Sequence, residues 1–262
     1  MAVEAGNAER HELVVASWNL HEGVSARAGA GPADAEVLAE VTELLTDRRV
    51  DVVAFQEVGF DAEGSSELLS RVRETTALRH VVAFPLHASS FFPGRLGGVA
   101  LAGRFPWRDA RRVLLPNPGL SAVVGGNEIH SHDKGLVHAT CRWGGRDLGV
   151  TSLHSFPFYL FGRDPGEAEF KGIWDALAAD VRRSARSGPA LVCGDFNTGD
   201  RALVLDRGSL PLSSATAGRV TYPRGAVDDV LHTADAGLPL RAEAITNFSD
   251  HKVLLCAFGN VP

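Results

Sequence analysis

The chain has 262 residues, with 26 lysines and arginines against 32 aspartates and glutamates, and therefore a formal net charge of −6. Hydrophobic residues make up 45% and charged residues 22%, which is typical of a globular protein and excludes a disordered or collagen-like chain. No apolar run approaches the ~18 residues of a membrane span, and residues 1–12 lack the apolar stretch of a signal peptide, so we expect a cytoplasmic protein. The acidic balance argues against a protein that coats nucleic acid without specificity.

The first eleven residues are small and polar, and we expect a loose tail over residues 1–11. After this tail, short apolar runs typical of buried strands alternate with segments of helical periodicity. The predicted strands cover residues 13–18 and 50–55, and the predicted helices cover residues 34–48 and 65–78. Ser65 or Ser66 is a candidate N-cap of the second helix.

From residue 80 onward the pattern changes to short strand-like runs separated by glycine and proline turn signals. These predicted strands cover residues 80–85, 97–103, 110–115, 120–126, 135–143 and 146–153, and Gly144-Gly145 predicts a β-hairpin between the last two. The longest helical pattern follows at 166–186, with predicted strands at 190–193, 227–233, 240–246 and 252–258. Helices near both ends with many strands between them predict an α+β fold with more than one sheet, in a single domain over residues 12–262.

Several of the predicted strands end in polar clusters. These clusters are Asn19, Gln56-Glu57, His154, Asp195-Phe196-Asn197, Asp228-Asp229 and Ser249-Asp250-His251. Strand ends and the loops beyond them are where a rigid scaffold presents side chains. Because an unpaired carboxylate is costly to bury, the repetition of acids directly after apolar strands indicates a site rather than a core.

The residue types in these clusters point to one kind of chemistry. Glu57, Asp195 and Asp250 offer hard carboxylate oxygens, and Asn19 and Asn197 offer amide groups. This donor set suits Mg²⁺ or Mn²⁺ better than zinc, which prefers histidine and cysteine. Histidine can donate to a phosphate oxygen or pair with it. Together, carboxylates, asparagines and histidines predict metal-assisted phosphoester hydrolysis.

The same residues lie in motifs that resemble the ordered motifs of the endonuclease/exonuclease/phosphatase superfamily. The motifs are Ser17-Trp18-Asn19-Leu20, Gln56-Glu57-Val58, Gly194-Asp195-Phe196-Asn197-Thr198, Val227-Asp228-Asp229-Val230-Leu231 and Ser249-Asp250-His251. Residues 97–106 resemble the central strand of that superfamily, and Thr151-Ser152-Leu153-His154 its strand ending in histidine. The resemblance covers residues 13–258 and implies a DNase I-like fold, a four-layer α/β-β/α sandwich of two facing mixed β-sheets.

The resemblance also implies roles on the metal side of the site. Glu57 resembles the principal metal ligand, and Asp250 a second metal-side carboxylate. Asn19 resembles a residue close to both the metal and the scissile phosphate. Asp195 is similar to the group that orients or deprotonates the attacking water, and Asn197 to one that holds the phosphate or that water.

On the phosphate side, His251 resembles the histidine that bonds the phosphate as charge builds, and Asp228 the acid that orients it. His154 is similar to the phosphate-contacting or proton-donating histidine of the DNase I-like branch. That branch pairs this histidine with a glutamate in the central region, whereas residues 88–98 contain no acid. Whether His154 donates a proton or only a hydrogen bond is therefore open.

Other residues carry two interpretations. Phe156 and Phe158 either line the substrate pocket, which we predict, or pack under the 166–186 helix. Lys134 either contacts the phosphate or only begins a strand. His21, Glu22, His130, His132 and Asp133 include a His-x-His pair that could bind metal, but we interpret them as loop residues.

The sequence thus predicts a divalent-metal-dependent phosphoester hydrolase with Mg²⁺, or Mn²⁺, as cofactor. The leading hypothesis is a phosphodiesterase or nuclease that cleaves P–O bonds of DNA or RNA by in-line attack of an activated water. One alternative is a phosphatase or phospholipase-like hydrolase of a small or lipidic phosphate ester. The other is a catalytically inactive family member that acts as a binding module. No protein partner is implied, and we expect a monomer.

Overall fold

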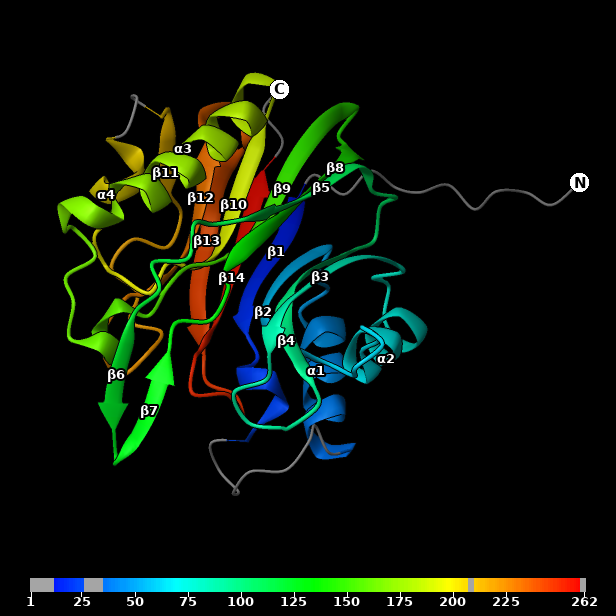
Figure 1. The fold of residues 1–262 in the computed structure, drawn as a ribbon. Helices are drawn as coiled ribbons and strands as arrows, with labels where there is room; N and C mark the ends of the chain where they lie inside the picture. Colours follow the sequence, from blue (N-terminus) through cyan, green and yellow to red (C-terminus); the bar gives the residue numbers. More distant parts are fainter. Residues whose placement is uncertain (1–11, 26–34, 207–209, 260–262) are drawn as a thin grey trace, which may run out of the picture.

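The computed structural model describes residues 12–25, 35–206 and 210–259, so the tail predicted for residues 1–11 lies outside the described part. Two six-stranded sheets face each other, with helices on their outer sides (Figure 1). The strand order is β13-β14-β1-β2-β4-β3 in the first sheet and β11-β12-β10-β9-β8-β5 in the second. This arrangement confirms the predicted α+β class and the sandwich of two mixed sheets.

The first sheet is mixed because β1 pairs in parallel with β2 and antiparallel with β14. Its strands are β1 (Glu12–Asn19), β2 (Val52–Phe60), β3 (His80–Ala88), β4 (Leu96–Gly103), β13 (Leu238–Ile245) and β14 (Val253–Gly259). Helices α1 (Ala35–Asp47) and α2 (Glu67–Thr75) pack on its outer face. Ser66 caps α2 by accepting a hydrogen bond from the backbone N–H of Leu69.

The second sheet is also mixed, since β9 and β10 run parallel while β8 and β9 form the antiparallel hairpin predicted at Gly144-Gly145. Its strands are β5 (Arg108–Leu114), β8 (Gly135–Trp143), β9 (Arg146–His154), β10 (Ala190–Asp195), β11 (Leu212–Ser214) and β12 (Asp228–Thr233). Helix α3 (Lys171–Arg186) covers its outer face, and the short α4 (Ala202–Leu205) lies beside α3 (Figure 1).

Side-chain alternation along the strands separates the core into layers. On β1, Val14 and Ala16 face α1 and α2, whereas Leu13 and Val15 face the second sheet. Successive side chains of a strand point to opposite faces, so a strand with helices on one side and a sheet on the other is apolar at nearly every position. This explains why the sequences of these strands are continuous apolar runs.

A few elements were not predicted. The run 120–126 is the first half of a separate hairpin, β6 (Ser121–Val124) and β7 (Asn127–His130), which turns at Gly125 and Gly126 with φ of +57° and +85°. Short 3-10 turns were also missed, namely η1 (His21–Gly23), η2 (Phe158–Phe161), η3 (Ala168–Phe170) and η4 (Ala234–Ala236). Within the described ranges, no helix is long and apolar enough to cross a membrane.

Candidate active site

The predicted site residues meet at one end of the facing sheets, where two pairs of parallel strands finish. In the first sheet, the register of β1 and β2 places Asn19 beside Gln56. In the second sheet, the register places His154 beside Asp195, and Asp195 beside Asp228 of β12. The two sheets make contact here, because Asn19 Nδ2 donates a hydrogen bond to Asp195 Oδ2 at 3.1 Å.

Asp195 is a buried carboxyl at the centre of the group. Its Oδ1 accepts a hydrogen bond from the backbone N–H of Asn197 at 2.7 Å. Its Oδ2 lies 3.6 Å from His154 Nε2 and 3.8 Å from His251 Nε2. Burial, and then the charge of Asp228, raise the pKa of Asp195 to about 7, while the charge of His251 opposes them. A carboxyl with a pKa near neutrality is suited to accept a proton at physiological pH.

His251 forms a buried pair with Asp228, whose Oδ2 lies 2.9 Å from His251 Nδ1. Burial alone would lower the pKa of His251, but the charges of Asp228 and Asp195 outweigh it and raise the pKa to about 10. The imidazole is therefore protonated at neutral pH and can donate from Nε2 to an anionic oxygen. The carboxylate of the neighbouring Asp229 instead accepts hydrogen bonds from the side chains of Ser214, Thr216 and Arg201.

Glu57 lies at a bulge in β2, where the register with β4 shifts between Phe55 and Val58. A bulge re-aims a side chain, and Glu57 Oε1 lies 3.6 Å from His154 Nε2. The backbone of Glu57 is left-handed, with φ of +48°. Three other non-glycine residues around this end share that conformation: His21, Glu22 and Asn197. Strained backbone of this kind is concentrated at functional sites.

Three residues offer oxygen ligands that suit a hard divalent cation. The side chains of Glu57 and Asp250 are 23% and 29% exposed, and within the described ranges their ion pairs involve only histidines. Asp250 Oδ2 lies 3.9 Å from His21 Nε2, and Asn19 Oδ1 accepts a hydrogen bond from the backbone N–H of His21. The accessible carboxylates of Glu57 and Asp250, with the buried amide oxygen of Asn19, have the chemistry that fits Mg²⁺ or Mn²⁺.

A second, more compact group could also hold a cation, because ligand atoms of Asp195, Asp228 and His251 all lie within 4.8 Å of one another. Its chemistry fits a metal less well. The hydrogen bond between His251 and Asp228 already uses the Nδ1 atom, and a protonated imidazole has no lone pair for a metal.

Lys134 lies beside His154, the histidine for which the sequence offers no glutamate partner in residues 88–98. Its buried Nζ is 3.2 Å from His154 Nδ1 and 3.3 Å from Nε2. Burial, and next the charge of Lys134, hold the pKa of His154 well below its usual value. Burial also lowers the pKa of Lys134, although the charges of Glu57 and Asp195 oppose this. The imidazole of His154 is therefore neutral here, which suits a hydrogen-bonding group better than a proton donor.

The family model described as the Endonuclease/Exonuclease/phosphatase family matches residues 16–251, a span that includes all of these residues. The chain belongs to this family. A search of curated proteins finds no match.

Solved structures with the same fold include an endonuclease/exonuclease/phosphatase from Beutenbergia cavernae, at a TM-score of 0.71 and 19% identity over 96% of this chain and 72% of that one. The catalytic domain of human Nocturnin with a bound sulfate anion matches at a TM-score of 0.64 and 20% identity, over 95% and 93% of the chains. Sphingomyelinase C from Streptomyces griseocarneus matches at 0.60 and 14%, over 95% and 99%. At such identities, the likeness establishes a shared fold.

Two residues that we predicted to bind substrate belong instead to the core of this endonuclease/exonuclease/phosphatase family member. Phe156 and Phe158 are fully buried, and Phe158 packs against Phe170 and Trp174 with ring centroids 4.5 and 5.9 Å apart. The prediction of a pocket wall is therefore wrong for both, because the apolar run turns inward under α3. In that segment Pro157, Tyr159 and Phe161 are half-buried and Leu160 is exposed.

Several residues near the site were not assigned to it from the sequence of this family member. His21 contacts Asp250, and the buried Glu22 accepts hydrogen bonds from Ser89 and the backbone of Ser90. His132 instead lies beside His87, whereas His130 is 67% exposed and pairs with Glu128. The predicted loop is thus correct for His132 and Asp133, whereas His130 ends strand β7. It is incomplete for His21 and Glu22, which the turn after β1 brings close to Asp250 and Glu57 respectively.

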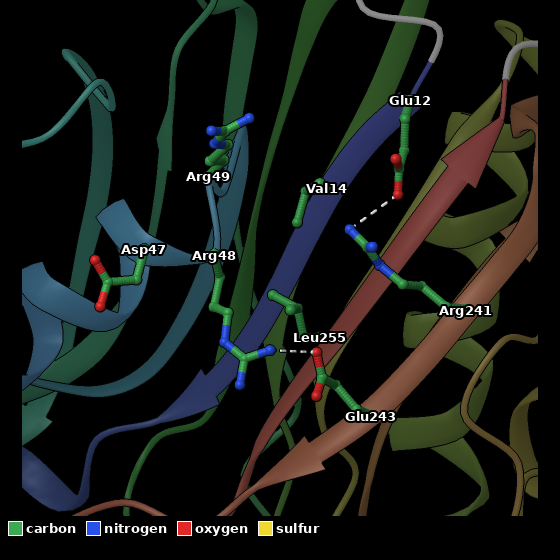
Figure 2. Close-up of a pocket in the computed structure, with 8 residues that line it drawn as sticks. All are labelled: Glu12, Val14, Asp47, Arg48, Arg49, Arg241, Glu243 and Leu255. Carbon is green, nitrogen blue, oxygen red and sulfur yellow. Dashed lines mark hydrogen bonds and ion pairs between the residues drawn. The ribbon is translucent and has the colours of Figure 1, made fainter.

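A separate groove contains none of the predicted site residues of this family member (Figure 2). It has a volume of about 640 Å³ and begins near Glu12, at the opposite end of β1 from Asn19. Two ion pairs cross it, from Arg48 to Glu243 at 2.9 Å and from Arg241 to Glu12 at 3.0 Å (Figure 2). Such exposed pairs are typical of a charged surface and contribute little to stability.

Proposed function

We propose that the protein is a divalent-metal-dependent phosphodiesterase that cleaves nucleic acid by in-line attack of water on phosphorus. The observation that carries this proposal is the position of Asp195, a buried carboxyl with a raised pKa between two histidines and two asparagines. Family membership supports phosphoester chemistry of this general kind.

The metal would be held by Glu57 with Asp250 and Asn19, which supply carboxylate and amide oxygens. When bound, it would supply positive charge that stabilises the non-bridging oxygens of the phosphate. Activation of the water and binding of the phosphate would be carried out by side chains of the protein itself.

Asp195 is the proposed general base. The hydrogen bonds from Asn19 and Asn197 fix its carboxylate, and the buried position places its pKa close to the pH of the reaction. It would therefore orient the attacking water and take its proton. Asn197 donates its own side-chain amide to the backbone carbonyl of Ser155 at 2.9 Å, which holds this loop against β9.

His251, His154 and Lys134 form the proposed phosphate-binding side. Protonated His251 can donate from Nε2 to a phosphate oxygen, and Asp228 stabilises the charge and the orientation of its ring. Lys134 adds a buried positive charge beside His154. The neutral state of His154 favours a hydrogen-bonding role over proton donation to the leaving group.

The alternative of a lipidic phosphate ester is favoured by one observation. Apolar side chains are exposed near the site, with Leu160 at 41% and Val123 and Val124 of the β6–β7 hairpin at 73% and 48%. Strand β6 contacts η2, which carries Leu160 next to Tyr159. Such a rim could contact acyl chains as well as nucleic-acid bases.

A substrate panel tests these proposals. Plasmid DNA, single-stranded RNA, bis(p-nitrophenyl) phosphate and sphingomyelin vesicles would each be incubated with Mg²⁺, with Mn²⁺ and with EDTA. We expect metal-dependent cleavage of a nucleic acid that weakens steeply as salt rises, since phosphate contacts release counterions. Cleavage of sphingomyelin alone would favour the lipid alternative, and hydrolysis of none would favour an inactive binding module. The Asp195→Asn and His251→Ala variants serve as controls against a contaminating nuclease.

A further inference from the structure

A row of three side chains leads from His251 to the surface. The Tyr222 ring stacks on the His251 ring, with centroids 4.5 Å apart and an interplanar angle of 25°. The Tyr159 ring follows, with its centroid 6.2 Å from that of Tyr222. The guanidinium carbon of Arg224 lies 4.6 Å from the centroid of the Tyr159 ring. The chain has only two tyrosines, and both lie in this row.

The row is fixed to the residues that hold His251. Tyr222 and Gly225 exchange two backbone hydrogen bonds, of 3.2 and 2.9 Å, which close the turn that carries Arg224. Gly225 has φ of +133°, a backbone conformation that residues other than glycine rarely adopt. Thr221 then ties this turn to the site, since its hydroxyl accepts from the backbone N–H of Asp228 and its carbonyl from that of Lys252.

The contacts within the row decide what it can bind. His251 stacks on one face of the Tyr222 ring and Arg224 covers one face of the Tyr159 ring, so these two faces are not free to stack on a base. What the row offers a ligand is the edge groups, namely the phenolic hydroxyls and the guanidinium. Burial above all, with the charges of Asp195 and Glu57, raises the pKa of Tyr159, so its hydroxyl remains a donor.

Arg224 itself is available for a ligand. It is exposed, and no carboxylate within the described ranges forms an ion pair with it. A guanidinium stacked on an aromatic ring keeps its N–H groups in the plane of the fork, where they can bind a phosphate through two hydrogen bonds. The chemistry of the row is therefore that of an anion site and not of an aromatic platform.

We propose that Arg224, Tyr159 and Tyr222 form a subsite, adjacent to the reacting phosphate, that binds a second phosphate group of the substrate. This inference rests on the proposed phosphodiesterase function and adds to it a preference for substrates with more than one phosphate. Adjacent phosphates along a nucleic-acid strand meet that requirement.

The test compares thymidine 5′-monophosphate with thymidine 3′,5′-bisphosphate as inhibitors of bis(p-nitrophenyl) phosphate hydrolysis in excess Mg²⁺. We expect the inhibition constant of the bisphosphate to be roughly five- to tenfold lower for the unmodified protein, as befits one charge-assisted phosphate contact at an accessible site. Arg224→Gln should bring the ratio of the two constants close to one. Tyr159→Phe, which keeps the ring under Arg224 but removes its hydroxyl, should lower the ratio partly.

Arg219→Gln is the matched control, because Arg219 is exposed in the same loop and the substitution removes the same charge. It should leave the ratio of the two inhibition constants as in the unmodified protein. Equal constants for the two nucleotides in the unmodified protein, or a ratio that Arg224→Gln does not change, would overturn the subsite. If the protein hydrolyses no phosphodiester, the proposed function fails, and calorimetric titration of the same nucleotides with the same variants still decides the subsite separately.

Discussion

Replacing Asp195 by asparagine should abolish activity and at the same time stabilise the fold. The two side chains have nearly the same shape, so the introduced amide can keep one of the hydrogen bonds from Asn19 or from the backbone of Asn197. It cannot accept a proton from water. Loss of a general base lowers kcat by about 10²- to 10⁴-fold, which corresponds to roughly 3–5 kcal/mol of transition-state stabilisation.

The expected gain in stability follows from the raised pKa of the same carboxyl. Its usual value of 3.8 rises to about 7 in the folded protein, where burial disfavours the charge. Since one pKa unit corresponds to about 1.4 kcal/mol, ionised Asp195 destabilises the metal-free protein by up to about 4 kcal/mol above neutral pH. This net value already includes the attraction to protonated His251, which lowers the pKa. The neutral amide removes the cost without opening a cavity.

The measurement is thermal or urea unfolding of both proteins in EDTA between pH 4 and pH 8, beside kcat in Mg²⁺. The difference in stability should be smallest near pH 4, where the folded carboxyl is protonated and the unfolded one is only about half ionised, and should grow up to about pH 7. A variant that is inactive but less stable at pH 8 would mean that Asp195 is a structural carboxylate. A variant with unchanged kcat would show that it is not the base.

Three further predictions follow from the other groups of the site. Glu57→Gln should raise the Mg²⁺ concentration for half-maximal activity at least about tenfold while leaving Tm in EDTA nearly unchanged, and equal metal titrations would exclude it as the principal ligand. The pKa of His251 is raised from 6.5 to about 10, so its contribution to stability is complete below pH 6.5 and is lost as pH rises toward 10; His251→Asn should flatten the decline of Tm over this window. Tyr222→Leu should lower kcat by about tenfold and Tyr222→Phe much less, if stacking on His251 positions its ring; equal losses would assign the effect to the hydroxyl.

Much of the fold could be predicted from the sequence because continuous apolar runs mark its buried strands, whereas apolar residues at helical spacing mark its helices. The predicted strand at 146–153 and the hairpin turn at Gly144-Gly145 match β9 and its connection to β8. The exceptions are short elements such as β11, whose three residues carry no measurable periodicity. The predicted run 120–126 includes Gly125 and Gly126, whose positive φ turns the chain there. The polar Asn127 and Glu128 give the returning strand β7 no apolar signal.

The site was predictable to the extent that its residues end strands. Asn19, His154 and Asp195 follow apolar runs, and strand register then brings them together. Tyr222 has no such signal, because it lies in an irregular segment whose place is fixed by hydrogen bonds to Asp228 and Lys252 rather than by a pattern. The prediction of a pocket wall at Phe156 is wrong because proximity to His154 in the sequence does not show which way the segment faces, and α3 covers it.

The end of the sandwich that carries these residues concentrates two unfavourable features, namely left-handed backbone at non-glycine residues and buried charged groups. Of the six non-glycine residues with positive φ in the described ranges, four lie here: His21, Glu22, Glu57 and Asn197. The same end buries charged Lys134, His251 and Asp228 together with Asp195, groups that an apolar core excludes because of their desolvation cost. Neither the strain nor the burial stabilises the fold, so both depend on the surrounding core of two packed sheets. This concentration supports the candidate site from physical chemistry, independently of the motifs. It also explains why a net charge of −6 does not argue against the proposed phosphate binding, since buried Lys134, protonated His251 and a bound dication would offset the carboxylates at this end.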